Sequence, residues 1–406
     1  MNKYEILSFH PGRQHNFEQA NQIQKFFKNF KHLTSLYFDD LTIKKWQAIH
    51  PKIAKELKRR SSLLDRKFVD TNASSEIQLL IKQKLRRRIS NSDFINRNSR
   101  FQKWVIKNYN PPKILIGYDT SSWLVFEKWK GKTFLILDLS IAVPHYKVTL
   151  GRENGLDLDF QKKLTVGDEF LYDIYEKELN LADLVLCGSE FVKKSCLSLG
   201  VDERKLFVLP YGADLKRFNN TEKRVETTNE IKIVFVGSVS YRKGANVLLE
   251  AWQRIYRQYP DATLHFYGGV QIDLPKKIER VYFHGHVDQE VLINELKSAH
   301  ISVLPSFFEG SSLAIYQSMA MRLAVITTPN SGSIIKNEED GIIISYGSVE
   351  ELTSSMGRLI EDKKFRQRIS NKACEEIKAF TWDAYGLKLK NVIDTIKNQG
   401  TYPIVS

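Results

Sequence analysis

The chain has 406 residues, of which 42% are hydrophobic and 11% aromatic, the composition of a globular protein large enough for two domains. Its cysteines, Cys187, Cys196 and Cys374, are odd in number and lack CxxC spacing, so the sequence predicts no disulfide framework or zinc site and favours a reducing compartment. The N-terminus lacks the apolar core of a signal peptide, and no apolar run approaches the roughly 20 residues of a membrane span. We therefore expect a cytoplasmic protein.

The formal net charge of +14 is concentrated in one region. Residues 52–113 contain 17 basic and 5 acidic residues, a net charge of +12. This concentration describes a surface, and three roles for it remain open. A solvated helical face is the default. An anionic membrane surface comes next, because a cationic helix gains on the order of 1 kcal/mol per Lys or Arg near anionic lipid. Nucleic acid is the least favoured partner, because no RNA-binding motif accompanies the aromatic residues of the region.

In the first half, short apolar runs alternate with stretches of helical spacing. We expect strands at residues 4–9, 33–38, 114–118, 133–137, 184–187 and 206–209, and helices at 16–30, 120–130, 170–181 and 189–199. Residues 45–110 are mostly helical in pattern and basic, with a loop or helix junction at 91–100.

A polar segment at residues 216–230 indicates an interdomain linker, after which the alternation resumes. We expect strands at residues 231–236, 263–267, 281–284, 301–304, 324–327 and 341–344, and helices at 244–259, 289–299, 312–321 and 349–361, followed by tail helices over roughly 364–397. Strands that alternate with helices in both halves predict an α/β protein with two doubly wound parallel sheets facing each other.

Two polar turns in the second half follow predicted strands, the position at which parallel sheets bind ligands. The first, within Ser306–Gln317, contains Glu309 and leads into a helix whose free N–H groups could face an anion. The second contains Arg242 and Lys243 at the start of a helix, and two cations there suit a diphosphate. Taken alone, the first turn fits a solvated loop better than a site, and the second fits either equally well. A third turn, at residues 327–333, could line the same cleft.

These segments resemble the donor site of family 4 retaining glycosyltransferases of GT-B fold, the glycosyl transferases group 1. The segments that carry the resemblance are residues 182–190, 208–214, 235–244, 309–317 and 324–332. The resemblance extends over about residues 170–382, whereas residues 45–110 match no pattern that we can name. It implies an acceptor-side Rossmann-like domain at 1–215 with a basic helical insertion at about 45–110, the linker 216–230, a donor-binding domain at 231–380 and a helix at 381–406 that crosses back to the first domain.

The resemblance also implies roles for residues in the second half. Glu309 would contact the donor sugar near its reacting carbon. Gln317 stands where the family has a second Glu and would bind the ribose, and it can form hydrogen bonds but cannot carry charge. His286 and Val287 would flank the base. The residues that would bind the donor diphosphate are Arg242, Lys243, Gly237, Ser311, Ser312, Leu313 and Gly12. Ser238 stands where the family commonly has Arg, a function that Arg242 could take over.

In the first half, Gly12 matches the N-terminal glycine loop of the family, although a tight turn explains it almost as well. His145 is the expected active-site histidine, with Asp138 as the fallback. Asp119 and Thr120, at another strand end, could face the acceptor or cap a helix.

We therefore expect transfer of a sugar from a nucleotide diphosphate sugar to a hydroxyl of a glycan or lipid-linked acceptor, with retention at the anomeric carbon and without a metal or cofactor. The resemblance suggests cell-surface polysaccharide, lipopolysaccharide or glycolipid synthesis, in the cytoplasm or on the inner face of the membrane. One alternative is a glucan synthase or phosphorylase of the same fold. Another is a catalytically inactive sugar-nucleotide sensor or nucleic-acid-binding protein, which Gln317 and the pI of about 9.4 would suit.

Overall fold

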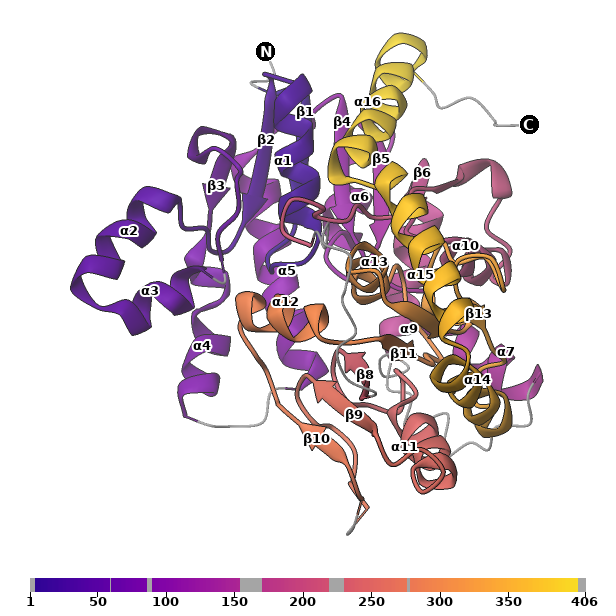
Figure 1. The fold of residues 1–406 in the computed structure, drawn as a ribbon. Coiled ribbons are helices and arrows are strands. Elements are labelled where there is room, and N and C mark those ends of the chain that lie inside the picture. The colour runs from indigo at the N-terminus through magenta and orange to yellow at the C-terminus, as the bar shows by residue number, and fades with distance from the viewer. Residues whose placement is uncertain are drawn as a thin grey trace.

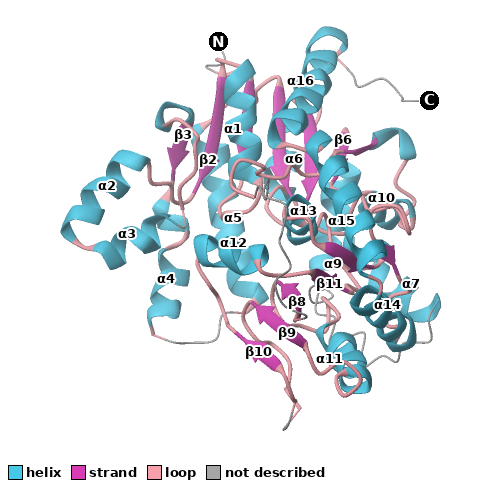
Figure 2. Ribbon diagram, in the orientation of Figure 1, coloured by secondary structure: helices cyan, strands magenta, loops and turns pink. Residues whose placement is uncertain are grey.

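The structure is a computed structural model that describes residues 4–58, 60–85, 90–153, 170–218, 230–275 and 278–400. It contains two parallel β-sheets, one from each half of the chain, and helices flank both sheets (Figures 1 and 2). Both sheets are rich in Ile, Leu, Val and Phe, because strands covered on both faces need apolar side chains on both faces.

The first sheet has seven parallel strands in the order β3-β2-β1-β4-β5-β6-β7. Its strands are β1 (Ile6–Phe9), β2 (Phe30–Thr34), β3 (Val69–Thr71), β4 (Ile114–Tyr118), β5 (Phe134–Leu139), β6 (Leu184–Cys187) and β7 (Leu206–Val208). Its α-helices are α1 (Asn16–Phe26), α2 (Asp40–Ile49), α3 (Pro51–Lys58), α4 (Ile77–Lys84), α5 (Asn91–Asn108), α6 (Trp123–Trp129), α7 (Tyr146–Glu153), α9 (Phe170–Leu181) and α10 (Glu190–Leu197).

The second sheet has six parallel strands in the order β10-β9-β8-β11-β12-β13. Its strands are β8 (Ile231–Val236), β9 (Ala262–Tyr267), β10 (Val281–Phe283), β11 (Ile301–Leu304), β12 (Ala324–Thr327) and β13 (Ile342–Ile343). The helices are α11 (Ala245–Ile255), α12 (Gln289–Lys297), α13 (Leu313–Ala320), α14 (Val349–Glu361), α15 (Lys363–Glu376) and α16 (Trp382–Gln399). Short 3₁₀ turns at 66–68, 73–75, 203–205, 329–331 and 377–379 complete the described elements.

Both sheets are doubly wound, so the fold class predicted from the sequence, α/β with two Rossmann-like units, is confirmed. In each sheet the first strand of the unit lies in the interior, and the chain extends the sheet first to one side and then to the other. The carboxyl ends of the strands at this reversal are the ligand-binding edge of such sheets.

Two predicted elements in the first half are wrong, and a third, the mostly helical region 45–110, also contains a strand. The second strand spans Phe30–Thr34 rather than residues 33–38, because Phe30 pairs with Ile6 of β1 and fixes the register. The helical region 45–110 contains the strand Val69–Thr71, which is short and polar and so has no strand pattern of its own. Residues 91–100 are not a junction but the start of α5, which Ser90 and Asp93 begin with a reciprocal capping box.

The last helix, α16, packs against α1 of the first half (Figure 1). Lys25 of α1 forms an ion pair with Asp383 at 2.5 Å. A Cβ on Gly386 would approach the Gln22 side chain within 2.7 Å, so the two helices are close enough to require glycine there. Ala213 pairs with Thr381, and the chain therefore passes between the two units at two adjacent points. Most of the predicted linker 216–230 lies outside the described residues.

Among the residues that the structure describes, no helix combines the length and the apolar character needed to cross a membrane.

Candidate active site

An acidic side chain and two basic side chains meet at the carboxyl edge of the second sheet. Glu309 follows β11, and Arg242 and Lys243 follow β8. Glu309 Oε1 lies 2.6 Å from Arg242 Nη1 and 2.7 Å from Lys243 Nζ. Arg242 Nη1 also donates to the carbonyl oxygen of Phe308 at 2.7 Å, which fixes the guanidinium on the Glu309 turn. The sequence predicted that these three residues share one site, and the structure brings them into direct contact.

The charge balance of this cluster favours an anionic ligand. Burial raises the pKa of Glu309, but Lys243 and Arg242 lower it by more, so that its pKa lies below the ordinary value and the carboxylate is ionised at neutral pH. One carboxylate faces two cations, which leaves an excess positive charge in a largely buried turn. Lysine and arginine together also offer more N–H donors than the three contacts to Glu309 and Phe308 use.

Gly237 leaves room for the side chain of Lys243, the second cation of the cluster. Gly237 directly follows β8 and has a φ of 138°, a backbone conformation that other residues rarely adopt. A Cβ there would lie 3.1 Å from Cδ and Cε of Lys243, so the lysine stem packs directly over the glycine. Gly237 therefore positions Lys243.

The start of α13 provides unpaired polar groups beside Glu309. Ser312 occupies the N-cap position, but its side chain forms no capping bond. Among the described residues, the buried hydroxyls of Ser240, Ser306 and Ser312 have no hydrogen-bond partner. Buried polar groups are rarely left unpaired, and a cluster of them in turns after β8 and β11 indicates a ligand site. The backbone N–H groups of Leu313 and Ala314 precede the first helical hydrogen bonds, in which Ile315 and Tyr316 donate to the Ser312 carbonyl oxygen, and helix-start N–H groups of this kind can bind an anion.

The turn that carries Glu309 is held against the first half of the chain. Gly310 pairs with Ile141, and the Ser189 hydroxyl donates to the Gly310 carbonyl oxygen at 2.6 Å. A Cβ on Gly310 would lie 2.0 Å from the Ser140 carbonyl oxygen, which leaves no room for any other residue. The loop after β5 and the donor-side turn therefore form one wall between the two sheets.

The structure places the remaining predicted donor-side residues around this turn. Gln317 is half-buried in the second turn of α13. His286 is exposed and its Nε2 lies against Gly269, at which a Cβ would come within 2.9 Å. Val287 is half-buried beside it. Ser311 accepts a hydrogen bond from the backbone N–H of Tyr211 at 3.4 Å, so its hydroxyl contacts the segment that connects the two units.

His145, the histidine predicted to be catalytic, contacts α9. Its ring lies 4.1 Å from that of Tyr172, and its Nε2 lies 3.4 Å from Glu176 Oε1. Burial lowers the pKa of His145, despite the opposing effect of Glu176. Its Nδ1 is buried and has no partner among the described residues. These contacts place the ring on the α9 side of the loop after β5.

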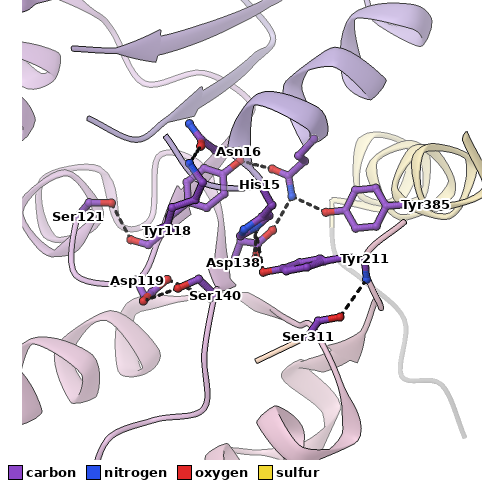
Figure 3. Close-up of polar contacts among 12 residues, drawn as sticks. His15, Asn16, Tyr118, Asp119, Ser121, Asp138, Ser140, Tyr211, Ser311 and Tyr385 are labelled. Carbon is purple, nitrogen blue, oxygen red and sulfur yellow. Dashed lines mark hydrogen bonds and ion pairs between the residues drawn. The ribbon is translucent and has the colours of Figure 1, made fainter. Parts of the chain in front are cut away.

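A second histidine, which the sequence analysis did not single out, lies in a buried polar cluster (Figure 3). His15 Nε2 lies 2.9 Å from Asp138 Oδ1, and the two side chains are 3% and 2% exposed. The His15 ring stacks on Tyr211, with 4.3 Å between the ring centroids. The other oxygen of Asp138 accepts a hydrogen bond from Gln19. The two partners are 123 residues apart in sequence, and no local pattern joins them.

This cluster, which consists of His15, Gln19, Asp138, Tyr211 and Tyr385, joins α1, β5, the interdomain segment and α16. Gln19 donates to the Tyr385 hydroxyl at 2.7 Å, and Tyr211 contacts Ser311 of the donor-side turn through its backbone. Burial, followed by the charge of Asp138, raises the pKa of both tyrosines well above the ordinary value, so they remain neutral. The cluster therefore fixes the relative positions of the elements that meet at the site.

Asp119, at the end of β4, orders the loop that reaches Gly310. It accepts hydrogen bonds from the N–H and the hydroxyl of Ser140, both at 3.0 Å, and from the Tyr175 hydroxyl at 2.9 Å. Thr120 has a φ of 58°, and its N–H donates to Glu178 at 2.7 Å. Asp119 thus orders this loop, a role different from the two that the sequence left open.

Comparison with known proteins agrees with this geometry. Residues 230–362 match the family model described as Glycosyl transferases group 1. A glycosyltransferase of Methanocaldococcus jannaschii is 28% identical over 268 residues, which cover 61% of this chain and 67% of that protein. The chain spans about half to two thirds of the length of curated relatives that it matches.

Solved structures share the whole fold. Sucrose-phosphate synthase from Thermosynechococcus elongatus superimposes with a TM-score of 0.69 at 16% identity, covering 97% of this chain and 99% of that one. Anabaena HepE, solved in complex with UDP, superimposes with a TM-score of 0.63 at 13% identity, covering 96% and 100%. The predicted GT-B architecture is thereby confirmed. The chain therefore has the GT-B fold, and residues 230–362 of its second half are similar to glycosyl transferases group 1.

Proposed function

We propose that the protein transfers a sugar from a nucleotide diphosphate sugar to an acceptor hydroxyl, with retention of configuration at the anomeric carbon. The observation that carries the proposal is the cluster of Glu309, Arg242 and Lys243, which lies at the ligand-binding edge of the second sheet and faces the loop after β5. The donor would lie between the two sheets, with its diphosphate on the cations and its sugar beside Glu309.

In this arrangement the two cations stabilise the leaving group. Cleavage of the bond between the sugar and the diphosphate leaves negative charge on the phosphate oxygens. Arg242 and Lys243 are fixed by Glu309 and Phe308 before the reaction, so they can stabilise this charge without reorganisation. The hydroxyls of Ser306 and Ser312 and the first N–H groups of α13 supply further donors. These groups can supply the charge stabilisation without a metal ion or a cofactor.

We assign Glu309 to the sugar and Gln317 to the ribose. The carboxylate of Glu309 can accept hydrogen bonds from sugar hydroxyls and can stabilise the positive charge that develops at the anomeric carbon. A front-face reaction, in which a leaving phosphate oxygen accepts the proton of the acceptor hydroxyl, requires no protein nucleophile. His286 and Val287 remain the proposed neighbours of the base. His145 remains the proposed active-site histidine, and Gly12 remains a proposed neighbour of the donor diphosphate.

Slow hydrolysis of the donor in the absence of an acceptor tests both the activity and its stereochemistry. UDP-glucose, GDP-mannose, ADP-glucose and dTDP-glucose are each incubated with the full chain, and proton NMR records the anomer that is released first. We expect one nucleotide series to be hydrolysed, with the α-anomer released first from an α-linked donor. First release of the β-anomer would contradict retention, and a glucan phosphorylase would instead require inorganic phosphate and a glucan.

We also propose that the basic arm lies on an anionic membrane surface. This arm, formed by α2, α3, α4 and the segments that join them to β3 (residues 40–58, 60–68 and 72–85), projects from the first sheet (Figure 1). Besides exposed lysines such as Lys44, Lys45 and Lys52, it carries large exposed apolar side chains at Leu41, Trp46, Ile49, Ile53, Leu63, Ile77, Leu80, Ile81 and Leu85. Cationic and apolar side chains on the same arm suit anionic lipid better than nucleic acid, which offers no apolar phase. A lipid-linked acceptor would then be presented beside the cleft.

A further inference from the structure

A cavity of about 580 Å³ lies at the carboxyl edge of the first sheet, separate from the Glu309 cluster. The loop after β1, the loop after β4, the basic arm, α5 and α9 all contribute to its wall. Its lining residues are His10, Gly12, Arg13, Gln14, Arg60, Asn91, Phe94, Ile95, Arg97, Asn98, Thr120, Leu171 and Tyr175. Of these residues, Gly12 alone was also predicted to contact the donor diphosphate.

Three arginines line the cavity: Arg13, Arg60 and Arg97. Two of them, Arg60 and Arg97, share the carboxylate of Glu76. Arg60 donates to Glu76 Oε1, and Arg97 Nη1 lies 3.9 Å from the same oxygen. Burial lowers the pKa of Arg97 to about 10, which still leaves the side chain protonated at neutral pH. Burial, and then the charge of Arg97, lower the pKa of His10 to about 3, so this ring is neutral and adds no charge. The cavity wall therefore has a net positive charge.

One of these guanidiniums has an unsatisfied donor. Nη1 of Arg60 is buried and has no hydrogen-bond partner among the described residues, although Nη2 of the same group is paired. A charged donor without a partner in a buried position is costly, and most proteins avoid it. The planar fork of arginine matches the oxygens of a phosphate or carboxylate, so an anion in the cavity would satisfy the group.

The contacts of the cavity wall connect it with the proposed reaction centre. Tyr175, which lines the cavity, donates to Asp119, and Asp119 holds Ser140 through two hydrogen bonds. Ser140 and Ile141 are the residues that contact Gly310, next to Glu309. The cavity thus lies on the first-domain side of the same wall, where an acceptor would approach a donor held by the second domain.

We propose that this cavity binds an anionic group of the acceptor, a phosphate or phosphate ester, through Arg13, Arg60 and Arg97. The assignment of this anion to the acceptor rests on the proposed function, whereas the anion-binding site itself does not. Phosphate is favoured over carboxylate because three guanidiniums converge on one cavity, and a phosphate has more oxygens for them to bind. The phosphate could belong to a soluble sugar phosphate or to a lipid phosphate, which share this chemistry.

Isothermal titration calorimetry of the full chain tests the proposal. The ligands are glucose 1-phosphate, octyl phosphate and, as a neutral comparison, methyl glucoside, each titrated with and without saturating UDP to separate the cavity from the donor site. We expect phosphate-dependent binding that persists with UDP present and that the double variant Arg13→Gln/Arg60→Gln weakens at least about tenfold. Stronger binding of octyl phosphate would indicate a lipid source, and stronger binding of glucose 1-phosphate a soluble one.

The control is Arg66→Gln, an exposed arginine of the same arm that donates to Val69 and does not line the cavity. It should leave phosphate binding unchanged, and neither variant should alter UDP affinity. Arg60→Lys keeps the charge but loses the fork and should fall between wild type and the double variant, which provides a second readout if the double variant unfolds. Equal phosphate binding by wild type, the double variant and Arg60→Lys would overturn the inference. Phosphate binding that depends on these arginines in a protein that binds no nucleotide would support the cavity and refute the proposed function.

Discussion

Glu309 accepts contacts from Arg242 and Lys243 with the same carboxylate oxygen, at 2.6 Å and 2.7 Å. The carboxylate thus holds in place the two cations that would bind the donor diphosphate. The Glu309 carboxylate therefore has two opposing effects on the binding of the substrate. The carboxylate orders its neighbours, but its negative charge repels the phosphates that approach them.

Glu309→Gln should separate these two effects. Loss of the negative charge leaves the affinity for the nucleoside diphosphate unchanged or higher, because the cations face less competition. Turnover of the nucleotide sugar should fall on the order of 10²-fold, the usual effect of removing one group that stabilises transition-state charge. Titration with the diphosphate and single-turnover kinetics measure the two quantities separately. A variant that loses diphosphate affinity but keeps its turnover number would contradict the roles assigned here.

Glu309 should also make the stability of the protein depend on pH. Its pKa in the folded protein lies below the ordinary value of 4.5, so its contribution to the free energy of unfolding is complete above pH 4.5 and is lost as the pH falls through the folded pKa. Urea unfolding at a series of pH values from 6 to 3 should show a steeper loss for wild type than for Glu309→Gln. Parallel curves would show that the ion cluster contributes nothing to the fold.

Gly310→Ala should disturb the contact between the two halves of the chain. The added methyl group would lie 2.0 Å from the Ser140 carbonyl oxygen, so the loop after β5 must move. We expect a destabilisation of about 1–3 kcal/mol, as for other overpacked sites, together with a loss of transfer activity. Thermal unfolding and an activity assay at a temperature where the variant is folded measure these effects. Unchanged activity in the folded variant would show that the wall between the sheets is not needed for the reaction.

Binding of the basic arm to membranes should depend on charge and salt. Wild type should float with vesicles that contain phosphatidylserine at low salt, less so at raised salt, and not with neutral vesicles. The triple variant Lys44→Glu/Lys45→Glu/Lys52→Glu should bind at least about tenfold more weakly, given roughly 1 kcal/mol per cation. Lys363→Glu/Lys364→Glu/Lys378→Glu, on exposed positions of the second half, is the matched control. Equal loss in both variants would indicate non-specific attraction rather than docking by the arm.

The sequence predicted the second sheet well because its strands are short apolar runs between clear turns. The strands at residues 231–236, 301–304 and 324–327 agree with the prediction at both ends. Apolar runs of this kind specify buried parallel strands with little ambiguity. The turns that follow them are the donor-side turns, so Glu309, Arg242 and Lys243 could be grouped before their contacts were known.

The first half was harder to predict because its buried positions are often polar. The first turns of α5 bury Arg97 and Asn98 rather than apolar residues, so the usual helical spacing is absent. The pair of His15 and Asp138 and the arginines of the cavity come from distant segments that only the fold brings together. The pairing of His15 with Asp138 has no signal in a single sequence, although the glycine loop at Gly12, just before His15, was recognised.

The proposed donor site is tested most directly by nucleotide binding to two charge variants. Arg242→Gln and Lys243→Gln each remove one cation from the diphosphate position, and Arg254→Gln removes one from the surface of α11, where it contacts Glu250 and Glu350. Calorimetry with UDP, GDP, ADP and dTDP should find one diphosphate that binds wild type and Arg254→Gln equally, and that binds each site variant at least about tenfold more weakly. Binding of no diphosphate to wild type, or equal binding to all four proteins, would contradict a glycosyl donor site at Glu309, Arg242 and Lys243.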